Sequence, residues 1–392
     1  MSGYGAIAVS RRAVTVLFYC LATFLLSRLL LEAIGVGARE LIYPVMQAEF
    51  RRAEFSTFVW LDIWGVWDTE WFLDIIRDGY DTAVRTTPGM EGQANWAFYP
   101  LFPYLSKYVS AAAGVEPFVA MLIVANAAFA AALPVIWYET AHHYGERAAS
   151  IAVALFCFLP GSYVFSSAYS ESLFLFAVIV SLAFARRERW LLAGCAAALA
   201  TMTRNLGILL VLPMLVHAWQ AHGGWRDRDV VLARRVALLI GMAIPVAALA
   251  GFMAYLNQLT GDPLAFASVQ SAWKRELQNP VLTLIGPFLL GGKVQPEIVP
   301  SIVMAWVSVF SLGILIMRRN WPHAVFMTAV AGITLASGIL SYFRLFLTMA
   351  PGIMALAAFL SPRPGVLWIA LGLAAAANGA MMITWALGLG IY

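Results

Sequence analysis

Acidic and aromatic side chains are interleaved in residues 64–80, and their spacing could place a base beside a substrate. On a helix with 100° per residue, Glu70 lies on a polar face and Trp71 lies in an apolar stripe. Asp68 falls in the middle of the apolar stripe. Because loss of hydration makes a carboxylate a stronger base, Asp68 is a candidate to accept the proton of a substrate hydroxyl.

Asp68 also has a purely structural interpretation. Aspartate is among the preferred N-cap residues, so Asp68 could simply begin the helix. The residues themselves leave both interpretations open. The other acids of this segment favour a solvated helix face, and Gly79 is the expected end of the helix.

Two arginines in apolar surroundings could bind an anionic group. Arg204 has no acid near it in the sequence, and Arg344 reaches the same outer headgroup depth from another apolar run. Ionisable groups at membrane depth are costly and by default indicate function, here the binding of a lipid phosphate. Alternatively, both side chains extend to lipid headgroups. Arg28 and Glu32 lie four residues apart and are expected to neutralise each other.

Polar and aromatic residues also recur at helical spacing between residues 257 and 298. Gln270, Trp273 and Lys274 share one face, and hydrogen-bonding groups, an aromatic ring and a cation together suit a sugar and a phosphate. Glu171 begins another apolar run. Its alternative role is that of a first-turn acid that complements the helix dipole.

Residues 95–104 place aromatic side chains, Tyr99 among them, between prolines. Such a cluster is typical of the aromatic belt at a membrane surface. Aromatic side chains beside an acid are also what a carbohydrate or lipid pocket would use. The sequence leaves both interpretations open.

The composition determines which elements must position these residues. Of 392 residues, 62% are hydrophobic and only 12% are charged, which is typical of a polytopic membrane protein. No segment has the density of Lys and Arg that nucleic acid requires as a partner. We predict an all-α transmembrane bundle of about eleven helices in one domain, residues 1–392. The apolar runs lie near residues 13–37, 118–138, 147–165, 171–186, 190–202, 205–220, 233–256, 299–317, 321–341, 344–360 and 366–388.

The arginines orient this bundle, because short cytoplasmic loops carry an excess of Lys and Arg. With the N-terminus inside, each short loop on the inner face has at least one arginine, and most of the 21 carboxylates fall on the outer side. Two long loops, residues 38–117 and 257–298, are then external. The runs 190–202 and 205–220 are short and predict a hairpin whose tip, residues 201–205, points outward.

Six motifs, taken in order, resemble the phosphatidylinositol-glycan class V family, the mannosyltransferases that add the second mannose of the GPI anchor, and their bacterial relatives. The resemblance covers residues from about 60 to 350. It implies a GT-C glycosyltransferase fold with a long helical first external loop, a polyprenyl- or dolichyl-phosphate sugar donor, and inversion at the anomeric carbon. The motifs are Trp67-Asp68 with Gly79-Tyr80, Ala97–Pro103, Ala168–Phe174, Thr203-Arg204, Gly261–Phe266 with Gln270 and Trp273, and Arg344.

The resemblance implies that Asp68 is the catalytic residue. It places Arg204, with Arg344 or Lys274, at the donor phosphate, although the family often has an aromatic residue where this chain has Leu345. A monophosphate leaving group beside arginines has less need of a divalent ion, so we expect no metal and no cofactor. The substrate-binding residues that we expect are Trp67, Glu70, Trp71, Tyr99, Glu171, Gln270 and Trp273.

The function expected from the sequence is therefore transfer of a sugar, taken to be mannose, to an acceptor hydroxyl at the external face of the membrane. The acceptor is expected to be a lipid-linked molecule or a glycan, and membrane lipids surround the enzyme. The alternatives are a transporter or lipid flippase, which usually shows repeated halves, and a non-catalytic subunit of a glycosylation complex. Short Ala-rich loops without Asn-x-Ser/Thr sequons favour a bacterial plasma membrane over the endoplasmic reticulum.

Overall fold

A computed structural model describes residues 2–46, 52–221, 232–273, 275, 277–289 and 295–389, and within these residues it contains helices and no strand. The predicted all-α class is confirmed. The helices are α1 (Ser2–Leu41), α2 (Tyr43–Met46), α3 (Val59–Asp62), α4 (Asp68–Asp78), η1 (Asn95–Ala97), α5 (Leu101–Ala113), α6 (Pro117–Tyr144), α7 (Glu146–Phe158), η2 (Ser162–Phe165), α8 (Glu171–Arg186), α9 (Trp190–Thr203), η3 (Asn205–Leu210), α10 (Val211–Ala221), α11 (Leu232–Thr260), α12 (Ala265–Ser268), η5 (Val269–Trp273), α13 (Pro280–Leu289), η6 (Pro296–Ile298), α14 (Val299–Met317), α15 (Trp321–Ala336), α16 (Tyr342–Thr348), α17 (Ala350–Leu360) and α18 (Pro364–Ala386).

Each of the eleven apolar runs forms helix, but not every run forms one long helix. Five helices of the described chain are long and apolar enough to cross a membrane, or six if the bent pair α16 and α17 counts as one span. That pair bends by 77° at Met349. Pro351 at the start of α17 accounts for the break, because proline has no N–H for the helical ladder. The chain is an integral membrane protein.

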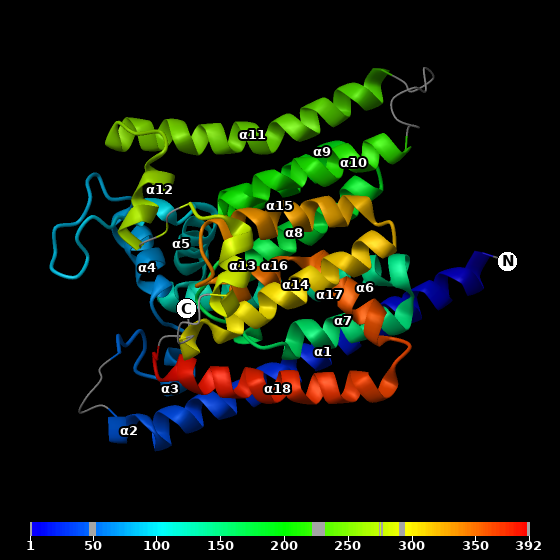
Figure 1. Cartoon of the computed structure of the whole chain (residues 1–392). Helices are drawn as coiled ribbons and strands as arrows, with labels where there is room; N and C mark the ends of the chain where they lie inside the picture. The colour runs from blue at the N-terminus through cyan, green and yellow to red at the C-terminus, as the bar shows by residue number, and fades with distance from the viewer. Residues whose placement is uncertain are drawn as a thin grey trace.

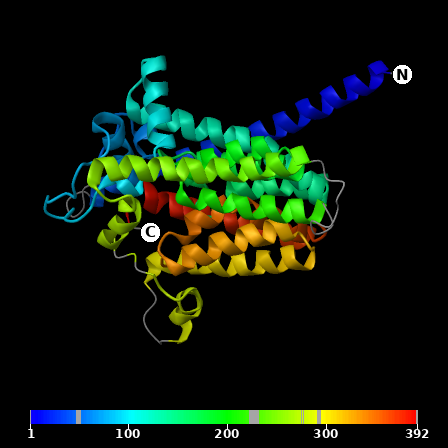
Figure 2. The ribbon, with the colours of Figure 1, turned by 90° about the horizontal axis from the view of Figure 1, so that it is seen from above.

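The helices lie side by side in one bundle, and the short helices of the two long loops gather at one end of it (Figure 1). Figure 2 shows the same arrangement from above, with the N-terminus at the opposite end. The described arginines of the short loops share the N-terminal end, where Arg12 pairs with Glu146 at 2.6 Å and Arg186 with Glu139 at 2.7 Å. Both long loops therefore lie on one side, as predicted, and the assignment of that side as external stays a prediction.

Arg28 does not pair with Glu32 as expected. Its guanidinium is buried and donates hydrogen bonds to the carbonyl oxygens of Cys157 and Ser162, and to the hydroxyls of Ser162 and Ser166. Because α7 ends at Phe158, the turn after it offers carbonyls that no helix uses. Arg28 thus ties the middle of α1 to the segment that leads into α8.

The first long loop is attached to the last helix. Arg52 donates to the carbonyl oxygens of Ala386, Asp62 and Gly65, and it also pairs with the Asp62 carboxylate at 3.1 Å. The indole N–H of Trp385 donates to the carbonyl oxygen of Ile63. These contacts fix the chain immediately before α4, so the loop enters α4 from a defined position.

The predicted hairpin of residues 190–220 is present, formed by α9 and by η3 with α10. Gly207 lies against the end of α9, and a Cβ there would be 2.2 Å from the backbone nitrogen of Thr201. Only glycine fits at this approach. The turn at Arg204 lies between these two elements, so the close contact holds Arg204 at the loop end of the bundle.

Gly207→Ala should therefore destabilise the hairpin, by about 1–3 kcal/mol, because the new methyl group overlaps backbone that cannot move aside. Thermal unfolding in detergent measures the loss. Gly372→Ala is the matched control, since a Cβ at Gly372 meets no atom within 4 Å. Equal unfolding temperatures for the two variants would contradict the prediction.

Candidate active site

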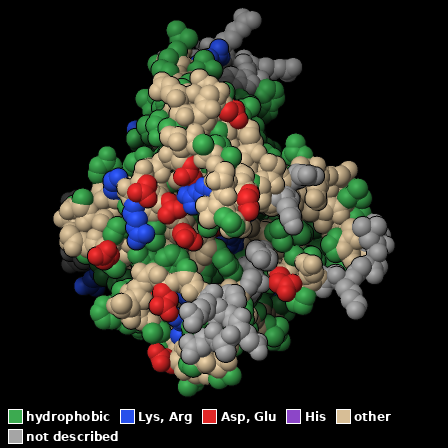
Figure 3. All heavy atoms as spheres, turned by 90° about the vertical axis from the view of Figure 1, so that its left-hand side faces the viewer, with side chains coloured by type: hydrophobic (Ala, Val, Ile, Leu, Met, Phe, Trp, Pro, Cys, Tyr) green, Lys and Arg blue, Asp and Glu red, His purple; other side chains and the backbone are tan. Residues whose placement is uncertain are grey.

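One cavity of about 440 Å³ lies at the loop end of the bundle. Figure 3 views this end of the molecule and shows acidic and basic side chains gathered near the middle of the face. The cavity brings together residues from both long loops and from the ends of the helices. The candidate residues that line it are Asp68, Tyr99, Glu171, Arg204, Gln270, Trp273 and Arg344.

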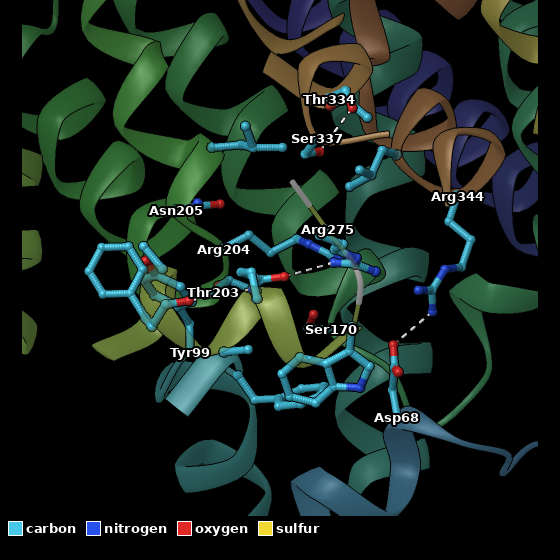
Figure 4. Close-up of a pocket in the computed structure, with 18 of the residues that line it drawn as sticks. Asp68, Tyr99, Ser170, Thr203, Arg204, Asn205, Arg275, Thr334, Ser337 and Arg344 are labelled. Carbon is cyan, nitrogen blue, oxygen red and sulfur yellow. Dashed lines mark hydrogen bonds and ion pairs between the residues drawn. The ribbon is translucent and has the colours of Figure 1, made fainter. Parts of the chain in front are cut away.

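Asp68 is the first residue of α4, and its carboxylate turns into the cavity rather than back onto the helix. Trp67 occupies the N-cap position, and no side chain caps the helix. Oδ2 of Asp68 instead accepts a hydrogen bond of 2.8 Å from the Arg344 guanidinium (Figure 4). The N-cap interpretation is therefore wrong. Among the described residues, Oδ1 accepts no hydrogen bond, and 31% of the side chain is exposed.

The backbone immediately before Asp68 is strained. Trp67 has φ 35° and ψ −95°, a conformation that residues with a side chain rarely adopt. Such a conformation costs about 1–3 kcal/mol and persists only where the surroundings hold it. Trp67 itself lies outside the cavity, and its ring packs edge-on against Trp385.

A buried carboxylate links two of the arginines. Glu171 begins α8 and is 1% exposed, and its Oε1 lies 2.8 Å from Nη1 of Arg204 and 3.9 Å from Nη1 of Arg344. Arg204 follows the last residue of α9, and Arg344 lies in the short α16. Although Glu171 does begin a helix, its buried position between two arginines places it in the site as well.

The second long loop contributes a third arginine, which the sequence did not single out. Arg275 lines the cavity, donates to Oε1 of Gln270 at 3.3 Å and contacts the Ser341 hydroxyl at 3.4 Å. Arg275 is exposed to solvent, although loss of hydration beside the surrounding protein and the positive charges of Arg344 and Arg204 lower its pKa. No acid pairs with it in the described chain. Lys274, the cation predicted for this role, lies outside the described residues.

Aromatic side chains form the wall of the cavity that faces the first loop. Tyr99, Phe98 and Trp273 line it, with Phe266 beside them. Tyr99 and Phe266 are in edge contact, with ring centroids 5.7 Å apart. The aromatic segment 95–104 therefore forms part of the cavity wall.

Three of the expected substrate contacts are not in this cavity. Glu70 is exposed on the polar face of α4, and Trp67 lies behind Asp68. Trp71 is buried one layer deeper, between Phe98 and Trp273 and under the Arg85 guanidinium, where it supports the aromatic wall. Trp67 and Trp71 lie close to Asp68 in the sequence. A motif alone therefore cannot distinguish residues that line the cavity from residues that support its wall.

Several lining residues were not among the expected site residues, although Ser170 and Thr203 lie within two of the motifs. They are small polar side chains from helix ends, and they could form hydrogen bonds to a sugar or a phosphate. In the described residues, no group of three or more His, Cys, Asp or Glu side chains is arranged to hold a metal ion. The polar residues are Ser170, Thr203, Asn205, Thr334 and Ser337.

In its fold, this helical membrane bundle is similar to solved structures of the GT-C fold. No protein-family model matches the sequence, and no curated protein sequence matches it significantly. Solved structures do match. The oligosaccharyltransferase of Archaeoglobus fulgidus in its apo form is 13% identical, with a TM-score of 0.52 over 95% of this chain and 56% of that one.

A second similar structure is ArnT from Cupriavidus metallidurans, bound to undecaprenyl phosphate. It is 15% identical, with a TM-score of 0.53 over 91% of this chain and 63% of that one. The chain spans less than two thirds of the length of either structure. At such low identities the similarity concerns the fold alone.

Glu171→Gln should lower the free energy of unfolding by about 3 kcal/mol, because the buried ion pair with Arg204 loses one of its two charges. Glu146→Gln is a matched control, since Glu146 also begins a helix and pairs with an arginine, but at the exposed end. Its change should stay below about 1 kcal/mol. Denaturant titration compares the two variants, and similar losses would show that Glu171 is not held as a buried ion-pair partner.

Proposed function

We propose that this protein is an inverting glycosyltransferase that moves a sugar from a polyprenyl- or dolichyl-phosphate donor to an acceptor hydroxyl. One observation carries the proposal: a carboxylate with one unengaged oxygen, Asp68, shares a cavity with the guanidinium groups of Arg204, Arg275 and Arg344. A base and an anion-binding group in one site are what a single displacement at a phosphorylated sugar requires.

In this proposal Asp68 is the general base. The acceptor oxygen attacks C1 of the sugar from the face opposite the phosphate, and its proton passes to Oδ1 of Asp68. The bond between C1 and the phosphate oxygen breaks as the new glycosidic bond forms, so the configuration at C1 inverts. The hydrogen bond from Arg344 to Oδ2 fixes the carboxylate, which leaves Oδ1 directed to the acceptor.

The charge balance of the cavity favours a monophosphate leaving group. Glu171 and Asp68 oppose Arg204 and Arg344, and Arg275 is left as the cation without an acidic partner among the described residues. The departing lipid phosphate would gain its negative charge beside Arg275 and Arg204. Preorganised cations at the point where charge develops stabilise the transition state more than the ground state.

The aromatic wall supports a sugar as the transferred group. Rings such as Tyr99 and Trp273 offer flat apolar faces, while Gln270 and Glu171 offer hydrogen-bonding groups beside them. We propose mannose as the transferred sugar because the sequence motifs resemble those of the phosphatidylinositol-glycan class V mannosyltransferases. The fold of ArnT, a protein bound to undecaprenyl phosphate, supports a lipid-phosphate donor.

We further propose that the reaction takes place at the external face of a bacterial plasma membrane, with a lipid-linked or glycan acceptor. Support comes from the short-loop arginines that the structure describes, which lie at the end opposite the cavity. Purified protein in vesicles containing polyprenyl-phosphate sugars tests the function. Release of free polyprenyl phosphate distinguishes a transferase from a flippase, which moves the intact donor, and from a catalytically inert subunit.

Asp68→Asn should lower the turnover number by about 100- to 10,000-fold, because the acceptor proton has no base to receive it. The variant should still fold, with an unfolding temperature below that of the wild type because Arg344 loses its ion pair with Asp68. Asp78→Asn, at the exposed end of the same helix, provides the control. Full transfer by Asp68→Asn would refute the assignment of Asp68.

Arg275→Ala and Arg204→Ala should each raise the KM for the donor by about 10-fold or more, because each loses a charged contact to the phosphate. Initial rates at varied donor concentration give this constant. Arg318→Ala, at the other end of the bundle, controls for loss of a surface arginine. A donor KM that is unchanged in both cavity variants would argue against a phosphate site between them.

A further inference from the structure

The strained turn before Asp68 is bridged in two ways. Within the turn, the Thr69 N–H donates to the carbonyl oxygen of Val66 at 3.0 Å, and the Val66 N–H donates to the Thr69 hydroxyl at 3.1 Å. The second bridge comes from another part of the chain, through the hydroxyl group of Tyr169. Asp68 N–H donates to the hydroxyl oxygen of Tyr169 at 3.2 Å, and the same hydroxyl donates to the carbonyl oxygen of Val66 at 3.2 Å. Residues 66 and 68 are the two neighbours of Trp67, whose φ is positive. In a γ-turn these two groups would bond to each other. Here the Tyr169 hydroxyl is inserted between them.

Tyr169 also supports the partner of Asp68. The Arg344 guanidinium carbon lies 5.2 Å from the centroid of the Tyr169 ring, within the range of a cation–π contact. The ring packs against Trp385, with centroids 5.1 Å apart, and the side chain is fully buried. One rigid side chain therefore contacts the backbone of Asp68 and the arginine that binds its carboxylate.

We propose that Tyr169 is a positioning residue that sets the place of Asp68, an inference that rests on the proposed function. The hydroxyl holds the positive φ of Trp67, and this turn directs the Asp68 side chain into the cavity. The aromatic ring of Tyr169 holds the Arg344 guanidinium within hydrogen-bonding distance of Oδ2 of Asp68. Burial raises the pKa of Tyr169 well above its ordinary value, so the hydroxyl keeps the proton that it donates to Val66.

The chain offers a matched control in Tyr163. This residue is also fully buried, and its ring also packs against Trp385, with centroids 4.8 Å apart. Its hydroxyl has no hydrogen-bond partner in the described chain. Tyr163→Phe and Tyr169→Phe each remove one buried oxygen atom beside the same indole, but only Tyr169→Phe removes the link between Val66 and Asp68.

Two measurements on the full-length protein in detergent test the proposal. The first is hydrogen exchange by mass spectrometry of peptides that include residues 66–70. The second is steady-state transfer from a polyprenyl-phosphate sugar. We expect faster exchange of these peptides in Tyr169→Phe and a turnover number lowered by about 10- to 100-fold, as small misplacements of catalytic groups cause, with the donor KM changed by less than about twofold. Tyr163→Phe should leave both measurements near the wild-type values.

Each outcome supports or overturns the proposal that Tyr169 positions Asp68. Equal exchange in the two variants, or a turnover number unchanged in Tyr169→Phe, would overturn the proposal. A loss confined to folded yield, with normal turnover per folded molecule, would reduce Tyr169 to a structural role and also overturn it. If the wild type transfers no sugar, the proposed function fails, whereas the exchange comparison still tests whether Tyr169 holds the turn.

The wild-type protein provides a measurement that requires no variant. Its peptides over residues 66–70 should exchange more slowly than those over the exposed residues 86–91, because a buried hydroxyl holds the Asp68 amide. Rapid exchange of both segments would show that the turn opens freely, and the proposal would then be wrong even if Tyr169→Phe does not fold.

Discussion

The ion pair between Asp68 and Arg344 is the contact on which the candidate site depends, because it joins segments 276 residues apart in the chain. Arg344 is buried, and its pairing with Asp68 offsets the loss of hydration of both charges, which favours the placement of α16 against the start of α4. Glu171 extends the same constraint to α8 and to the tip of the α9 hairpin. The ion pairs of Asp68 and Glu171 with the two arginines thus bring the walls of the cavity together, and the apolar helices surround them.

The apolar helices could be predicted from the sequence because a membrane-spanning segment is defined by its composition. The runs near 171–186 and 299–317 match α8 and α14 at both ends. The run 344–360 was harder, since a break at Met349 leaves no mark on hydropathy, although Pro351 explains it afterwards. Length and apolarity therefore predicted where helices form better than they predicted which of them can cross the membrane.

The residues of the candidate site could also be predicted only in part from the sequence. Asp68, Arg204 and Arg344 could be found because an ionisable group in apolar surroundings is conspicuous, and the structure brings all three into one cavity. The partners of Arg28 could not, since they are carbonyl and hydroxyl oxygens that the segment after α7 brings to the guanidinium. Arg275 was missed for a related reason: its place depends on the path of a loop, and loops carry no hydrophobic periodicity from which to infer it.

The attachment of the first loop to the last helix has a consequence for the order in which the molecule is made. Arg52 and Ile63 are synthesised well before their partners Ala386 and Trp385, which lie 334 and 322 positions further along the chain. Until α18 has entered the membrane, the segment that leads to α4 lacks these anchors. A nascent chain that has inserted the helices before α18 therefore still lacks the hydrogen bonds that hold the segment before α4. Residues of α18, more than 300 positions further along the chain, complete the surroundings of this loop.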